Sequence, residues 1–128
     1  MSAWNLRHVV IVALAVSLSG CLDLCGNEVK SEVSSPDQRK RAVVFERSCG
    51  ATTPFSTHVS ILDRGEALPH SAGNAFAADG DHGAVKDMSV TVRWLSPKAL
   101  VIRYPALASV YHNETAAKGV TIAYETTQ

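Results

Sequence analysis

The chain has 128 residues, of which 46% are hydrophobic, and its 12 Lys and Arg residues balance its 12 Asp and Glu residues. This length suits one domain with a modest core. Because a neutral chain exerts little long-range attraction on phosphates, the charge balance argues against nucleic acid, and against an anionic lipid surface, as an electrostatic partner.

The N-terminal segment has the form of a bacterial lipoprotein signal peptide. Arg7 precedes an apolar run over residues 9–18, and small residues then lead to the lipobox-like sequence Leu18-Ser19-Gly20-Cys21. The run is too short for a membrane-spanning helix, which needs roughly 20 apolar residues. We therefore expect three parts: a signal peptide at residues 1–20, a tether lipidated at Cys21 at residues 21–27, and a single β domain at residues 28–128.

The three cysteines divide into one lipidation site and one pair. Acylation of Cys21 leaves Cys25 and Cys49, and export places both in an oxidising compartment, so we expect a disulfide between them. Two free thiols are the alternative, and a zinc site is less favoured because ligand spacing is absent nearby. Closing a loop of about 25 residues stabilises by roughly 3 kcal/mol in the chain-entropy model.

The tether and the residue after the lipobox bear on location. Cys25 follows Cys21 by four residues, a span of at most ~14 Å, so we expect the folded body to lie close to the bilayer. Leu22 stands where an Asp would argue for retention in the inner membrane. The expected location is the cell envelope or periplasm, with a palmitate-type anchor and the outer membrane favoured.

Beyond the tether, apolar residues alternate with a period of two, which is typical of half-buried strands. We expect an all-β fold, a small antiparallel meander or sandwich of five to six strands stapled by the disulfide, with one face buried. Residues 111–118 are the one stretch that tolerates a helical turn or two. The expected strands cover residues 29–33, 41–47, 57–63, 90–94, 100–104 and 120–124.

A long connection at residues 64–87 has almost no strand character and is the candidate binding loop. We expect Phe76 within it to fold back as a plug, with an exposed contact as the alternative. Two carboxylates and an imidazole lie close together in the sequence Asp79-Gly80-Asp81-His82-Gly83. EF-hand spacing is absent, so we expect turn residues, no metal and no cofactor. The candidate binding residues are Asn74, Phe76, Asp79, Asp81 and His82.

A hydrolase interpretation is available but weak. Ser56, His58 and Asp63 offer the residue types of a nucleophilic triad, yet the Gly-x-Ser-x-Gly turn is missing. His58 lies on the strand face opposite Val59 and Ile61, so we expect it to be solvated. We expect no catalytic residues.

Two resemblances accompany this interpretation. Ser35-Pro36-Asp37-Gln38 with residues 41–45 resembles the Ser-Pro-Asp-Gly turn of TolB-type propeller blades over one hairpin, although this chain is too short for four blades. Gln38 replaces the usual Gly, which argues against a positive φ. The lipobox, the Cys49-Gly50-Ala51-Thr52-Thr53 motif and the Asp-Gly-Asp-His-Gly sequence together resemble small bacterial lipoproteins. That resemblance implies secretion and one small β domain, and it implies no activity.

We therefore expect a non-catalytic envelope lipoprotein with a binding or structural role, held at a membrane by its lipid anchor and able to contact an envelope protein. One specific alternative is an inhibitor or immunity-like module that docks the 64–87 loop into a cell-wall enzyme. A small metal-dependent hydrolase built on His58, Asp79, Asp81 and His82 is the less favoured alternative.

Overall fold

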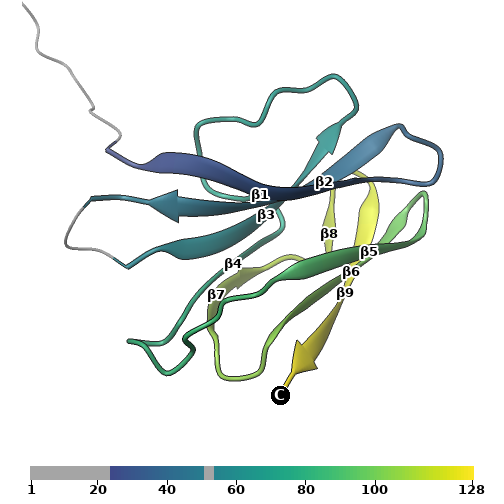
Figure 1. Ribbon diagram of the computed structural model, residues 1–128. Helices are drawn as coiled ribbons and strands as arrows, with labels where there is room; N and C mark the ends of the chain where they lie inside the picture. The colour runs from purple at the N-terminus through teal and green to yellow at the C-terminus, as the bar shows by residue number, and fades with distance from the viewer. Residues whose placement is uncertain (1–23, 51–53) are drawn as a thin grey trace, which may run out of the picture.

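The computed structural model describes residues 24–50 and 54–128, so the signal segment, Cys21 and residues 51–53 lie outside the described part. Within the described part the chain forms nine strands and no helix (Figure 1). The strands are β1 (Gly26–Ser34), β2 (Lys40–Ser48), β3 (Ser56–Asp63), β4 (Phe76–Asp79), β5 (Thr91–Ser96), β6 (Ala99–Pro105), β7 (Ser109–Asn113), β8 (Ala116–Ala117) and β9 (Val120–Thr127).

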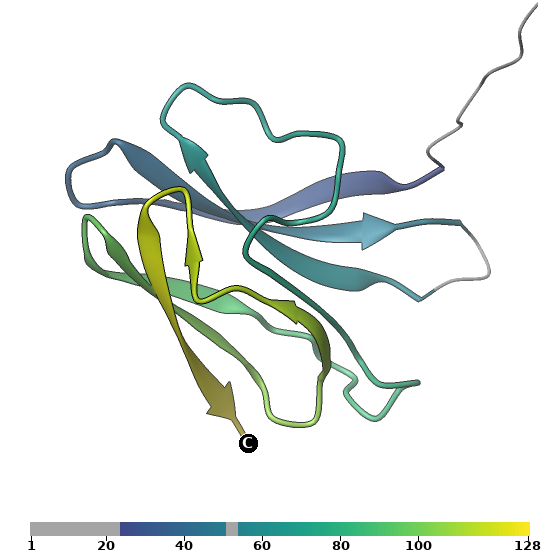
Figure 2. The ribbon, with the colours of Figure 1, turned by 180° about the vertical axis from the view of Figure 1, so that it is seen from behind.

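The strands form two stacked sheets, and Figure 2 shows the same layers from behind. One sheet has the order β1-β2-β3-β4-β7 and the other the order β5-β6-β9-β8. The core lies between them and is built from Ala42, Val44, Val59, Ile61, Ala75, Phe76, Ala78, Val90, Leu100, Ile102, Val120 and Ile122. The indole Nε1 of Trp94 also joins the sheets by donating to the Val33 carbonyl at 2.9 Å. The prediction of a disulfide-stapled all-β fold is confirmed.

All six expected strands are present, but three more were not predicted from the sequence. The connection at residues 64–87 contains β4. Residues 111–118, expected to tolerate a helical turn, belong instead to β7, to β8 and to the links on either side of β8. In addition β6 and β9 pair in parallel, whereas a purely antiparallel meander was expected. Alanine is rare in strands, so the Ala-rich β4 lacks a local signal, and its pairing with β3 and β7 decides its conformation.

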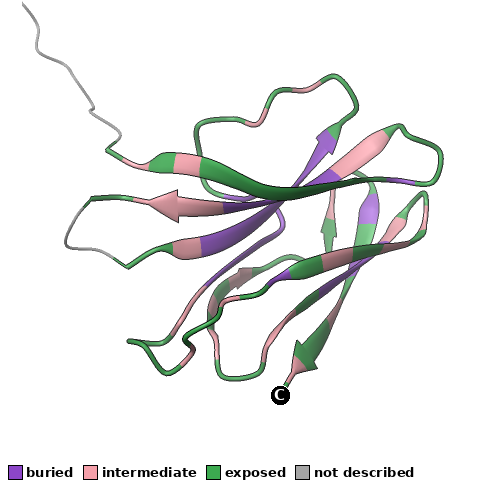
Figure 3. Ribbon diagram, viewed as in Figure 1, coloured by how far each residue is buried: buried purple, intermediate pink, exposed green. Residues whose placement is uncertain are grey.

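The five-stranded sheet is covered on both faces at β2 and β3, which corrects the expectation of a single buried face. Figure 3 shows the buried stretches concentrated along β2, β3 and β4. On the side away from the second sheet, Val43, Phe45 and Leu62 form a smaller buried cluster with Leu68 packed against it. Leu68 belongs to residues 64–75, here called the covering segment, which crosses this face before β4 (Figure 1).

The turn between β1 and β2 is built by side chains that bond to its own backbone. The Ser35 hydroxyl donates to Asp37 Oδ1 at 2.7 Å and accepts from the Lys40 amide at 3.1 Å. Gln38 has a φ of 59°, so the expectation against a positive φ at this position is wrong. The Gln38 amide donates to the Ser35 carbonyl at 2.8 Å, and this closed turn holds the left-handed conformation.

Candidate functional site

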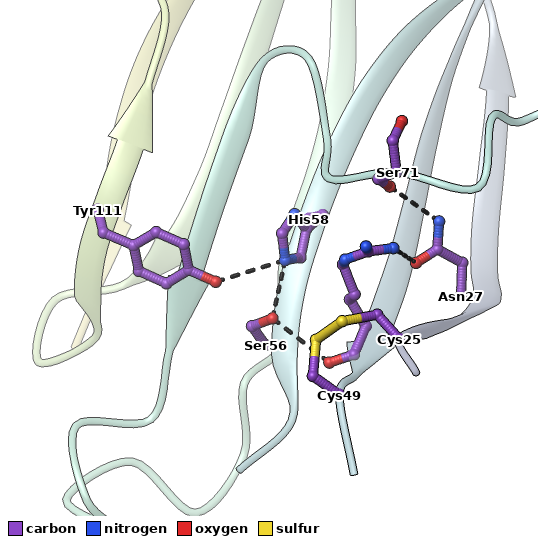
Figure 4. The surroundings of a disulfide bond; sticks show 8 residues. Cys25, Asn27, Cys49, Ser56, His58, Ser71 and Tyr111 are labelled. Carbon is purple, nitrogen blue, oxygen red and sulfur yellow. Dashed lines mark hydrogen bonds between the residues drawn. A yellow bond between two sulfur atoms is a disulfide. The ribbon is translucent and has the colours of Figure 1, made fainter. Parts of the chain in front are cut away.

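The Cys25–Cys49 disulfide joins the free end of the β1–β2 hairpin (Figure 4). Cys25 directly precedes β1 and Cys49 directly follows β2, and the terminal register pair of the two strands is Gly26 with Ser48. The bond therefore closes the hairpin at the end opposite its turn. The predicted pairing is confirmed, while Cys21 lies outside the described residues.

A buried polar cluster lies near this disulfide and is centred on His58 of β3. Its Nε2 atom is 2.8 Å from the Ser56 hydroxyl and 3.4 Å from the Tyr111 hydroxyl (Figure 4). Its Nδ1 atom accepts the Gly73 amide of the covering segment at 3.0 Å. The imidazole also stacks on Phe45, with ring centroids 5.3 Å apart.

This geometry assigns the tautomer of His58. Since Nδ1 accepts a backbone N–H, the ring proton of the neutral imidazole lies on Nε2. Nε2 then donates to the Ser56 hydroxyl, which is 3.4 Å from the Arg47 carbonyl and can donate to it. Burial lowers the pKa of His58 to about 4, and the charges of Arg47 and His112 act in the same direction. His58 is therefore neutral near pH 7.

A neutral imidazole that donates to a serine cannot also take the proton of that serine. In a Ser-His-Asp triad the carboxylate accepts from Nδ1–H, which frees Nε2 to act as the base. Here the Nδ1 position is occupied by the Gly73 amide. Asp63 lies at the opposite end of β3 from Ser56, where it forms ion pairs with Lys40 and Lys118. The arrangement does not assemble a nucleophilic triad.

His58 is only 2% exposed, so the expectation of a solvated strand histidine is wrong. Two contacts that the sequence did not reveal explain its burial. The covering segment approaches so closely that a Cβ on Gly73 would meet the Val59 carbonyl oxygen at 2.6 Å, which requires glycine there. Tyr111 lies at a register irregularity between β4 and β7, which local alternation does not indicate.

Two of the five predicted binding residues have structural roles. Asn74 uses its amide as a substitute strand partner, because Oδ1 accepts the Ile61 amide and Nδ2 donates to the Ile61 carbonyl, both at 2.8 Å. Phe76 is fully buried and packs against Tyr104 and Tyr124, with ring centroids 5.2 Å and 5.9 Å away. Phe76 is buried, as expected for a residue that folds back into the body, but it belongs to β4 rather than to a loop.

The other three predicted residues lie at the end of β4 and in the ordered turn that follows it. Asp79 accepts the Asp81 amide at 2.9 Å, and Asp81 and His82 have φ values of 49° and 54°. The Val85 amide closes the turn by donating to the Gly80 carbonyl at 2.9 Å. A shallow groove of about 390 Å³ runs beside it, lined by Asp79 and His82 together with Phe55 and Met88. Of the five candidate binding residues only Asp81 and His82 are exposed, whereas Asn74 and Asp79 are half-buried and Phe76 is buried.

Residues 24–50 and 54–128 contain no group of three or more His, Cys, Asp or Glu side chains placed to hold a metal ion. In the same described part no helix is long and apolar enough to cross a membrane. No family model, curated protein or solved structure matches the chain.

Proposed function

We propose that the protein is a non-catalytic lipoprotein of the bacterial cell envelope, with a binding or structural role and an acylated Cys21. The observation that carries the proposal is the Cys25–Cys49 disulfide. Disulfides persist in exported proteins and are rare in the cytosol. This bond uses two of the three cysteines, and the third is the lipobox cysteine of the sequence Leu18-Ser19-Gly20-Cys21.

The disulfide end of the body supports a position next to a bilayer. Cys25 follows Cys21 by four residues, so the tether spans at most ~14 Å. Two large apolar side chains are exposed at this end, Leu24 at 73% and Phe55 at 64%. Phe55 lines a shallow pocket together with Gly26 and Ser48, the first and last residues of the stapled hairpin. Exposed apolar groups beside a lipid anchor suit the bilayer interface.

Fractionation of the full chain tests this proposal. Wild-type protein and a Cys21→Ala variant are expressed in a host that processes lipoproteins, with an alkyne-labelled palmitate in the medium. We expect the wild type to carry the label and to sediment with membranes, and the variant to lose both properties while keeping its disulfide. A variant that sediments with membranes as completely as the wild type would contradict the proposal.

A second candidate function is an inhibitor or immunity-like module that docks the turn at residues 79–83 into a cell-wall enzyme. The observation in its favour is the preformed exposed turn, in which Asp81 and His82 hold left-handed conformations. A loop that is ordered before binding loses little conformational entropy on docking.

A photo-crosslinking residue at position 82, compared with one at exposed position 103, tests this candidate in intact cells. We expect a wall hydrolase to be captured from position 82 alone, and the purified protein to inhibit that hydrolase. Equal capture from both positions, or no inhibition, would exclude the candidate.

A further inference from the structure

A second polar surface lies at the end of the sandwich opposite the disulfide, where four turns meet. The β1–β2 turn, the turn after β3, the β5–β6 hairpin and the β8–β9 hairpin line an open groove of about 810 Å³, here called the basic groove. Its charged lining residues are the cations Arg39, Lys40, Arg64, Lys98 and Lys118 and the carboxylates Asp37 and Asp63. The basic groove is therefore positive although the chain as a whole is neutral.

Both carboxylates of the basic groove are engaged by neighbouring groups. Asp37 accepts the Ser35 hydroxyl at 2.7 Å and the Arg39 amide at 3.2 Å. Asp63 lies between two ammonium groups, with Lys40 Nζ 2.5 Å from Oδ1 and Lys118 Nζ 3.2 Å from Oδ2. Hydrogen bonds from these two lysines lower the pKa of Asp63. Asp63 thus stays ionised and compensates part of the charge of the two lysines.

The remaining cations, Arg39, Arg64 and Lys98, have no salt-bridge partner among the described residues, and all three are exposed. Main-chain hydrogen bonds fix the backbone positions from which these side chains extend. The Arg64 amide donates to the Arg39 carbonyl at 3.0 Å, and the Thr121 amide donates to the Lys98 carbonyl at 2.8 Å. The fold therefore concentrates an excess of positive charge around one groove, where a bound anion relieves the repulsion.

Arg41 shows that one wall of the basic groove is held rigidly. Its guanidinium forms an ion pair with Glu32 and donates through Nη1 to the carbonyls of Asp63 and Glu66, at 3.0 Å and 2.6 Å. These bonds hold the turn that carries Arg64. A positively charged site on a preorganised turn binds an anion at low entropic cost.

We propose that the basic groove binds a ligand that carries two or more phosphate groups. Arginine offers planar paired donors that match phosphate oxygens, and lysine adds a mobile point charge, so the combination suits a multiply charged phosphate compound. This inference deepens the proposed binding role by naming a ligand class. It does not depend on acylation of Cys21.

The groove lies at the end of the body opposite Cys25. β1 runs from the disulfide to the groove over nine residues, about 30 Å at the usual rise per residue. A body anchored near Cys25 therefore presents the groove to solutes, or to a facing membrane, more readily than to the lipids of its own anchor. The phosphate groups accordingly come either from a soluble compound or from lipid headgroups, and the test separates these sources.

Titration calorimetry with inorganic tripolyphosphate, on the full chain in detergent at low salt, measures binding of a soluble phosphate compound. Flotation with vesicles of phosphatidylglycerol and phosphatidylcholine, compared with vesicles of phosphatidylcholine alone, measures binding to lipid headgroups. The flotation uses the Cys21→Ala variant as background, so that the lipid anchor does not contribute. The test variant carries Arg39→Gln, Arg64→Gln and Lys98→Gln. The control variant loses the same charge at exposed sites outside the groove, through Lys86→Gln, Arg93→Gln and Arg103→Gln.

We expect the wild type to bind at least one probe, the test variant to bind about tenfold more weakly or worse, and the control variant to stay within about twofold of the wild type. Binding of tripolyphosphate alone assigns a soluble ligand, and binding of anionic vesicles alone assigns headgroups. Equal weakening in both variants, or no binding of either probe by the wild type, would overturn the proposal. Thermal unfolding of both variants at the wild-type temperature shows that each is folded.

Discussion

Replacing His58 with Asn removes a buried imidazole while keeping an acceptor for the Gly73 amide, because Oδ1 of Asn occupies nearly the same position as Nδ1 of His. His58 has a pKa of about 4 in the folded chain, against 6.5 for the free side chain. Well above pH 6.5 the imidazole is neutral in both the folded and the unfolded state, so it adds no pH dependence there. As pH falls below 6.5, the unfolded chain takes up a proton that the folded chain does not, and stability is lost until pH reaches about 4.

The magnitude follows from the two pKa values. At pH 5 the unfolded state is protonated and the folded state remains mostly neutral, so the linkage amounts to about 2 kcal/mol, rising to about 3 kcal/mol below pH 4. Urea unfolding of the wild type and of His58→Asn at pH 7.5 and pH 5 measures this contribution of His58 to the free energy of unfolding. We expect the wild type to lose about 2 kcal/mol more than the variant over this interval, since the carboxylates titrate in both proteins.

Exposed His82 supplies the matched control, because His82→Asn removes an imidazole without touching the His58 cluster. This variant should keep the pH dependence of the wild type. Nitrogen chemical shifts should place the proton of His58 on Nε2 at pH 7. A difference between wild type and His58→Asn that does not change with pH would refute the buried neutral state. A proton on Nδ1 would refute the argument against Ser56 as a nucleophile.

Three further predictions concern stability and are measured by urea unfolding. The double change Cys25→Ser and Cys49→Ser should cost about 3 kcal/mol, because it frees a loop closed by residues 24 positions apart, and a cost near zero would contradict the stapling role. Asn74→Ala should cost about 2 kcal/mol, since it leaves the amide and carbonyl of Ile61 without their partner, whereas a binding residue would be replaceable at no cost. Phe76→Ala should cost about 3–5 kcal/mol because it empties the centre of the core, and a loss below 1 kcal/mol would show that Phe76 is not packed there.

The strands that could be predicted from the sequence are those marked by β-branched residues between turns, such as β3 and β9. β4 could not, because its sequence Phe-Ala-Ala-Asp carries little strand preference and its conformation depends on partners contributed by β3 and β7. The parallel pairing of β6 and β9 likewise depends on contacts between residues far apart in the sequence. Local alternation indicates that a strand exists, and tertiary contacts decide which strand lies beside it.

The environment of His58 was mispredicted for a related reason. Its face of β3 is buried by the covering segment, whose path depends on residues far away in the sequence. Asn27 of β1 donates to the Pro69 and Ser71 carbonyls at 3.2 Å and 2.9 Å, which holds the covering segment over the sheet. A strand that alternates polar and apolar residues can therefore be buried on both faces when a loop supplies the polar partners.

The basic groove has no local signature at all. Arg39, Arg64 and Lys98 are separated by long stretches of chain and meet only because four turns share one end of the sandwich. The balanced net charge, from which no attraction for anions was expected, conceals this concentration. Net charge describes the whole surface, and a fold can still concentrate one sign of charge in one groove.

The mass of the mature N-terminal peptide, measured on protein isolated from membranes of a lipoprotein-processing host, tests the central claim most directly. The account predicts a chain that begins at Cys21 and carries two or three acyl groups, with Cys25 still joined to Cys49. An intact leader, or a mature terminus at any other residue, would contradict it.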